Sequence, residues 1–129
     1  MSTPRPPLVI TLIVWTILVW TTRIGNIWGD DALSDGEKWG RTGLALSFTA
    51  LAVAAAWAVW RGVTWRRGAV WALAGWTVAV WVVRSVGIAT GDHEAAFITV
   101  HLVLAAVSTA LSVLAVREVV ERRTAVAQR

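Results

Sequence analysis

The sequence contains no cysteine and only two histidines. Without cysteine the chain can form neither disulfides nor thiolate metal sites, and it has no cysteine nucleophile. A metal site would need more histidine or acidic ligands at close spacing. The sequence also lacks a Ser/His/Asp arrangement, a P-loop and a GxGxxG motif. We therefore expect a protein that is not an enzyme and that carries no metal and no cofactor.

Polar surface is scarce as well, since only 16% of the residues are charged and 57% are hydrophobic. The 129 residues are enough for a single domain, 1–129, and their mean hydropathy is +0.62. A net charge of +4 and a pI near 11.4 would suit a nucleic-acid binder. The basic residues stand at the ends of apolar segments, however, where membrane topology explains them. We expect the lipid bilayer as partner and no nucleic acid.

Four apolar segments are long enough to cross a bilayer, whose core of about 30 Å needs roughly 20 helical residues. We place the spans at about 8–27, 43–60, 69–89 and 95–116, followed by a basic cytoplasmic tail, 117–129. The connections between them are short, so the helices must run up and down as neighbours. The sequence therefore predicts an all-α, polytopic membrane protein with four transmembrane helices in an up-down bundle.

Most of the twelve basic residues belong to the N-terminus, the connection 61–68 and the C-terminal tail. The other two connections carry most of the acidic residues. By the positive-inside rule, we expect a plasma-membrane protein with its N- and C-termini in the cytoplasm. Tryptophans near the ends of the apolar segments are typical of the two membrane interfaces.

A sequence repeat links the two halves of the chain. Val19-Trp20-Thr21-Thr22-Arg23 recurs as Val80-Trp81-Val82-Val83-Arg84, and one fixed offset also pairs Trp15 with Trp76, Thr16 with Thr77, Ile27 with Ile88 and Asp31 with Asp92. In the second and fourth segments the offset is one residue shorter. The pattern predicts two parallel helical hairpins related by a pseudo-twofold axis along the membrane normal. The small residues of the second and fourth segments predict that these two form the inner pair, with the tryptophan-rich segments outside.

Each repeat places an arginine inside a membrane-length segment, where a charge is costly and usually functional. At a similar predicted depth the chain offers further polar groups, and together they form a candidate cluster of Arg23, Asn26, Arg84, Asp92, Glu94 and His101. One interpretation is structural, with the arginines reaching lipid headgroups or pairing with the acids. The other is a site for an anion, a lipid headgroup or a proton.

The stretch Val19-Trp-Thr-Thr-Arg-Ile-Gly-Asn-Ile-Trp28, with the following Gly-Asp-Asp31, resembles uncharacterised small four-helix integral membrane proteins of actinobacteria. The resemblance extends through Gly40-Arg-Thr-Gly-Leu-Ala-Leu-Ser-Phe48 and covers roughly the first half of the chain. It implies a small multi-helix membrane protein. It implies no particular activity.

Two functions follow as expectations. The first is a structural or accessory membrane component, because the chain is small, rich in lateral tryptophan and without catalytic residue sets. The alternative is a transporter or channel subunit that uses the Arg/His/acid cluster in the outer leaflet. One bundle of four helices offers only a narrow path, so the alternative calls for an oligomer. Both functions leave room for a homodimer or a larger membrane complex.

Overall fold

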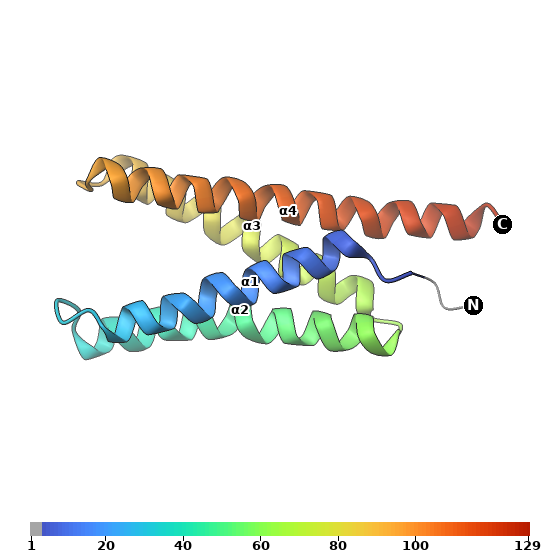
Figure 1. Ribbon diagram of the computed structural model, residues 1–129, viewed down its shortest axis with the longest axis horizontal. Coiled ribbons are helices and arrows are strands. Elements are labelled where there is room, and N and C mark those ends of the chain that lie inside the picture. The colour runs from blue at the N-terminus through green and yellow to red at the C-terminus, as the bar shows by residue number, and fades with distance from the viewer. Residues whose placement is uncertain (1–3) are drawn as a thin grey trace.

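A computed structural model of the protein describes residues 4–129. It contains four helices, α1 (Pro7–Trp28), α2 (Asp35–Arg61), α3 (Arg66–Thr90) and α4 (Ala95–Ala127), which run up and down as neighbours (Figure 1). Each helix is long and apolar enough to cross a membrane. The prediction of an all-α, four-helix polytopic membrane protein is thus confirmed.

The start of α2 differs from the sequence prediction, and α4 extends well beyond the predicted fourth span. We predicted a polar loop up to about residue 42, but α2 already begins at Asp35. The reason is a capping box, in which the Ser34 side chain accepts the Glu37 N–H and the Glu37 carboxylate accepts the Ser34 N–H. The basic tail is also helical, because α4 continues without a break to Ala127.

The order of the helices in the bundle also differs from the prediction. Helix α1 packs against α2 and α4, and α3 packs against the same two helices. In Figure 1, α1 and α3 cross each other between α2 and α4. The prediction that α2 and α4 form the inner pair is therefore wrong. Their small residues instead make room for large side chains of α1 and α3, as where Ala52 and Ala55 of α2 share a buried cluster with Leu12 and Leu73.

The buried faces of α1 and α3 follow the offset of the sequence repeat. Every buried residue of α1 has a buried counterpart in α3: Val9 and Val70, Leu12 and Leu73, Ile13 and Ala74, Thr16 and Thr77, Trp20 and Trp81, Ile27 and Ile88. In α2 and α4 the shorter offset holds, since Ala45 corresponds to Ala105 and Ala55 to Ala115, all four being buried. The two hairpins thus bury equivalent faces, while their common origin stays a prediction.

An aromatic layer fills the interior where α1 and α3 approach each other. The Trp20 and Phe48 rings stack at a centroid distance of 4.0 Å, and the Trp81 ring lies 6.1 Å from that of Trp20. Both tryptophans are only 2% exposed. These deep tryptophans are therefore packing groups that face neighbouring helices, and they close the interior at this level.

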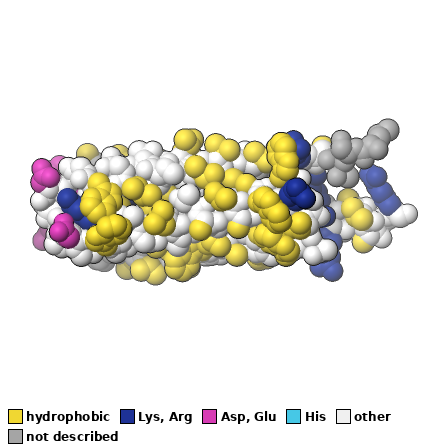
Figure 2. All heavy atoms as spheres, turned by 90° about the horizontal axis from the view of Figure 1, so that it is seen from below, with side chains coloured by type: hydrophobic (Ala, Val, Ile, Leu, Met, Phe, Trp, Pro, Cys, Tyr) yellow, Lys and Arg dark blue, Asp and Glu magenta, His cyan; other side chains and the backbone are white. Residues whose placement is uncertain are grey.

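The two ends of the bundle differ in charge. The end formed by the α1–α2 and α3–α4 connections, here called the acidic end, carries the acidic side chains of Figure 2. The opposite end, here called the basic end, holds the first described residues, the α2–α3 turn and the end of α4, and it carries most of the arginines seen in that view. Apolar clusters lie near both ends in Figure 2. Exposed tryptophans occur near each end, Trp28 and Trp39 at the acidic end and Trp57, Trp60, Trp65 and Trp71 at the basic end. This arrangement is typical of a membrane-crossing bundle with aromatic belts.

Candidate functional site

The arginines of the repeat lie just beyond the aromatic layer, toward the acidic end. Arg23 follows the buried Trp20 by three residues in α1, and Arg84 follows Trp81 by three residues in α3. Residues three apart share one face of a helix. Because the tryptophans point inward, both arginines are held toward the bundle, and both are partly buried.

Arg23 finds a neutral partner in His101 of α4. The Arg23 Nη1 lies 3.3 Å from His101 Nε2, and His101 Nδ1 lies 2.8 Å from the Phe97 carbonyl oxygen. A carbonyl can only accept, so Nδ1 carries the proton and donates it. Nε2 is then free to accept from the guanidinium. The two contacts together assign His101 as the neutral Nδ1–H tautomer. The His101 side chain is only 9% exposed and packs against the Phe97 ring.

Arg84 has no such partner. Its Nε is buried and makes no hydrogen bond within residues 4–129. The position in α2 that corresponds to His101 is held by Arg41, an exposed residue, which precedes the buried Ala45 by four residues just as His101 precedes the buried Ala105. Arg41 acts electrostatically on both Arg84 and Arg23. Arg23 of the α1–α2 hairpin thus meets an acceptor from the α3–α4 hairpin, whereas Arg84 of the α3–α4 hairpin is influenced by a second cation, Arg41, from the α1–α2 hairpin.

The acidic members of the predicted cluster do not neutralise these charges. Asp92 and Glu94 are exposed, and Asn26 is exposed as well. The ion pairs found between the described residues are Arg117–Glu121 and Arg122–Glu118, both in the last turns of α4. The predicted pairing of the helix arginines with acids is therefore not formed in this part of the chain. Of the six predicted site residues, the structure brings Arg23 and His101 into contact and places Arg84 close by.

Sequence reasoning missed Arg41, which we had placed in the loop before the second span. A usable signal was present, because the shorter repeat offset matches Arg41 with His101. It also missed Phe97, whose carbonyl orients His101. We call Arg23, Arg41, Arg84 and His101 the arginine cluster.

The chemistry available to the arginine cluster is anion binding. Guanidinium groups present several N–H donors in a plane that fits carboxylate or phosphate oxygens, and they stay charged at any physiological pH. Three guanidiniums with one neutral acceptor leave an excess of donors and of positive charge. An anion that bridges Arg41 and Arg84 would satisfy the buried Nε and remove the repulsion between the two.

Comparisons with protein-family models, with curated proteins and with solved structures found no match to this chain. The resemblance to small actinobacterial membrane proteins stays a prediction.

Proposed function

We propose that the chain is an accessory protein of the plasma membrane that binds the anionic headgroup of a lipid through its arginine cluster. In this proposal both termini lie in the cytoplasm and the acidic end faces outward, as the distribution of arginines favours. The observation that carries the proposal is the buried Nε of Arg84, which has no hydrogen-bond partner within residues 4–129.

A lipid headgroup suits the position of the cluster. The residues of α3 around Arg84 include Val82, Val83 and Val86, whose side chains are more than half exposed and apolar, as a lipid-facing surface requires. Trp28 and Trp39, in edge-to-face contact at 5.1 Å near the same end, are typical of headgroup depth.

Conduction through the bundle receives less support. The aromatic layer of Trp20, Phe48 and Trp81 lies about one turn deeper than the arginines and fills the interior with packed rings. An anion leaving the cluster toward the basic end would have to cross this layer of packed rings, in which the indole N–H of Trp81 is buried without a hydrogen-bond partner among residues 4–129. We therefore favour binding over transport.

The test is the stabilisation of the purified protein by an anionic lipid. We expect phosphatidylglycerol, added to protein in zwitterionic detergent, to raise the melting temperature, because a ligand present at about 100 times its Kd stabilises by about 2.7 kcal/mol. Arg84→Gln and Arg41→Gln should abolish this shift. Without lipid, Arg84→Gln should melt at or above the temperature of the parent protein, since it removes an unpaired, partly buried charge.

Lys38→Gln is the matched control. Lys38 lies on the same helix and at the same end as Arg41, and its ammonium group lies over the Trp28 ring at 5.9 Å. This variant should keep the full lipid response. If all three variants lost the lipid-induced rise in melting temperature equally, the rise would reflect net charge alone, and the proposal would be contradicted. Anion flux into vesicles that disappears with Arg23→Ala or Arg84→Ala would favour the transporter alternative instead.

A further inference from the structure

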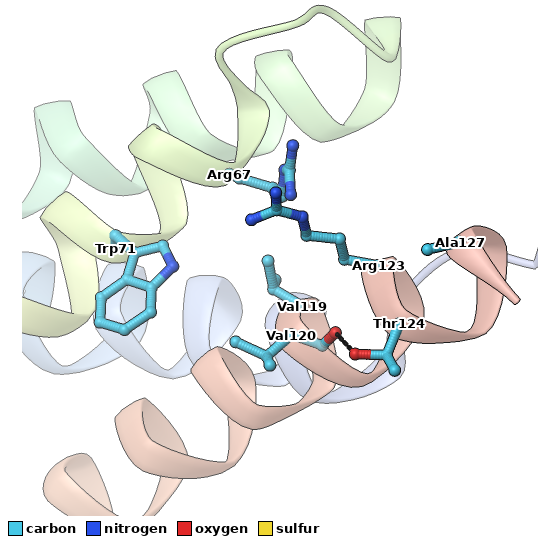
Figure 3. Close-up of a pocket in the computed structure, with 7 residues that line it drawn as sticks. All are labelled: Arg67, Trp71, Val119, Val120, Arg123, Thr124 and Ala127. Atoms are coloured by element: carbon cyan, nitrogen blue, oxygen red, sulfur yellow. Dashed lines mark hydrogen bonds between the residues drawn. The ribbon is translucent and has the colours of Figure 1, made fainter.

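A second cationic site lies at the basic end, far from the arginine cluster. A cavity of about 400 Å³ opens between the first turns of α3 and the last turns of α4. Arg67 and Arg123 both line it, and in the view of Figure 3 their guanidinium groups lie next to each other above Val119 and Val120, with Trp71 at one side. An adjoining hollow of about 600 Å³ shares Arg67, Val119 and Arg123 with it. We call the two together the basic pocket.

Among residues 4–129, no acidic residue lines the basic pocket. The two glutamates of this part of α4 are engaged elsewhere. Glu118 accepts the N–H groups of Leu8 and Val9 at 2.9 and 3.0 Å and pairs with Arg122. Glu121 pairs with Arg117, and both side chains are largely exposed. On the sequence alone these glutamates dilute the charge of the tail, but the structure removes them from the pocket.

The positive charge of Arg67 and Arg123 is therefore uncompensated. No ion pair within residues 4–129 involves either residue. Arg67 also belongs to the first turn of α3, where the helix dipole is positive and disfavours a cation. The N-cap residue there is Trp65, which gives no side-chain cap, and the first turn holds no acid. Two cations that line one pocket at an uncapped helix start are an arrangement that an anion stabilises.

We propose that the basic pocket binds a phosphate group between Arg67 and Arg123. Each guanidinium can donate two parallel N–H bonds to phosphate oxygens. Val119 and Val120 give the pocket an apolar side that suits the hydrocarbon part of a phosphate-bearing molecule. Trp71, about half exposed, is one of the exposed tryptophans at the basic end. The phosphate can come from a lipid headgroup of the adjoining leaflet or from a phosphate in solution. Both sources share this chemistry, and the experiment separates them.

The experiment measures which lipids the full-length protein retains. Protein in zwitterionic detergent is mixed with phosphatidic acid and phosphatidylcholine, and bound lipid is counted by native mass spectrometry. We expect preferential retention of phosphatidic acid. Arg67→Gln with Arg123→Gln should weaken that retention about tenfold or more, because one charged hydrogen bond contributes about 1.5–3 kcal/mol and 1.4 kcal/mol is a factor of ten.

The matched control is Arg61→Gln with Arg117→Gln, which removes the same charge from the same end. Neither residue lines the basic pocket. This control should retain phosphatidic acid as the parent does. Inorganic phosphate that displaces the lipid from the parent protein would identify a soluble phosphate as ligand, and lipid that withstands it would identify the headgroup.

Equal retention by the Arg67/Arg123 variant and the parent would overturn the proposal, as would an equal loss in the control. All four substitutions are at exposed positions of the bundle surface, so the helical circular dichroism signal should be unchanged. The basic pocket and the arginine cluster lie at opposite ends and are tested with different variants. Failure of one proposal therefore leaves the other standing.

Discussion

His101 shows how one side chain sets the charge state of its surroundings. Its Nδ1–H donates a hydrogen bond to the Phe97 carbonyl, so its Nε2 is an acceptor and accepts a hydrogen bond from the guanidinium of Arg23. A protonated imidazole would present a donor to a donor and would add a charge beside Arg23 and Arg84. The neutral ring is what allows one of the two repeated arginines to be satisfied inside the protein.

Replacing His101 with leucine should destabilise the protein. The substitution leaves a partly buried guanidinium without its acceptor, and the expected loss is about 1–3 kcal/mol of unfolding free energy. Unfolding by sodium dodecyl sulfate in mixed micelles measures it. His93→Leu is the control, because His93 is exposed, and we expect a change within about 0.5 kcal/mol.

The same residue can be tested by spectroscopy. Nitrogen-15 NMR of the imidazole rings should report the Nδ1–H tautomer for His101 at neutral pH. Acidification adds a proton to Nε2 and should break the bond to Arg23, so stability should fall as His101 becomes protonated. An Nε2–H tautomer, or a stability that rises when the ring is protonated, would show that the Arg23 contact is not the one described above.

At the scale of whole elements, the start of α1 depends on a residue of α4. The N-cap of α1 is Pro6, which provides no side-chain cap. Glu118 takes this role from across the bundle by accepting two N–H groups of the first turn, and its side chain is only 11% exposed. Arg122 completes the connection by donating to the Pro4 carbonyl at 2.6 Å. The last turns of α4 thus anchor the beginning of the chain.

Glu118→Ala should therefore loosen the start of α1. We expect a loss of about 1–3 kcal/mol, because two helix N–H groups and Arg122 lose their common acceptor. Hydrogen exchange at Leu8 and Val9 should accelerate. Glu121→Ala is the control, since its ion pair with Arg117 is exposed and should contribute at most about 0.5 kcal/mol. Equal effects of the two substitutions would mean that Glu118 is not the cap of α1.

At the scale of the whole molecule, the charges are sorted between the two ends of the bundle. Most acidic side chains lie at one end, and most basic side chains seen in Figure 2 lie at the other. Such sorting determines the orientation of small membrane proteins at insertion, because segments rich in arginine are retained in the cytoplasm. The absence of cysteine makes the orientation easy to measure, since every introduced thiol is unique.

We expect Asp31→Cys and Asp92→Cys to react with a membrane-impermeant maleimide in intact cells. Arg61→Cys and Arg129→Cys should react only after the membrane is permeabilised. Labelling in detergent controls for the accessibility of each thiol. The reverse pattern would place the termini outside, and equal labelling of all four positions in intact cells would indicate dual insertion.

The sequence predicted the four spans because the hydrophobicity of each span depends only on the residues within that segment. It misplaced the start of α2, where glycines and acids suggested a loop while the Ser34–Glu37 capping box forms a helix start. It identified Arg23, Arg84 and His101 as neighbours from the repeat and from helical spacing. It failed for Asp92, Glu94 and Asn26, because similar depth in the membrane does not require that side chains from different helices point toward each other.

The sequence alone determined that the protein has four helices apolar enough for a lipid environment, and it determined where along the chain these helices lie. Transfer of apolar residues to lipid adds up residue by residue, so four hydrophobic helices and their charge sorting can be read without a fold. Only the tertiary structure decided which polar groups meet: Arg23 with His101, and Glu118 with the start of α1. A hydrogen bond requires atoms from separate helices to lie within about 3 Å. That distance depends on how α1 and α3 cross over the small residues of α2 and α4.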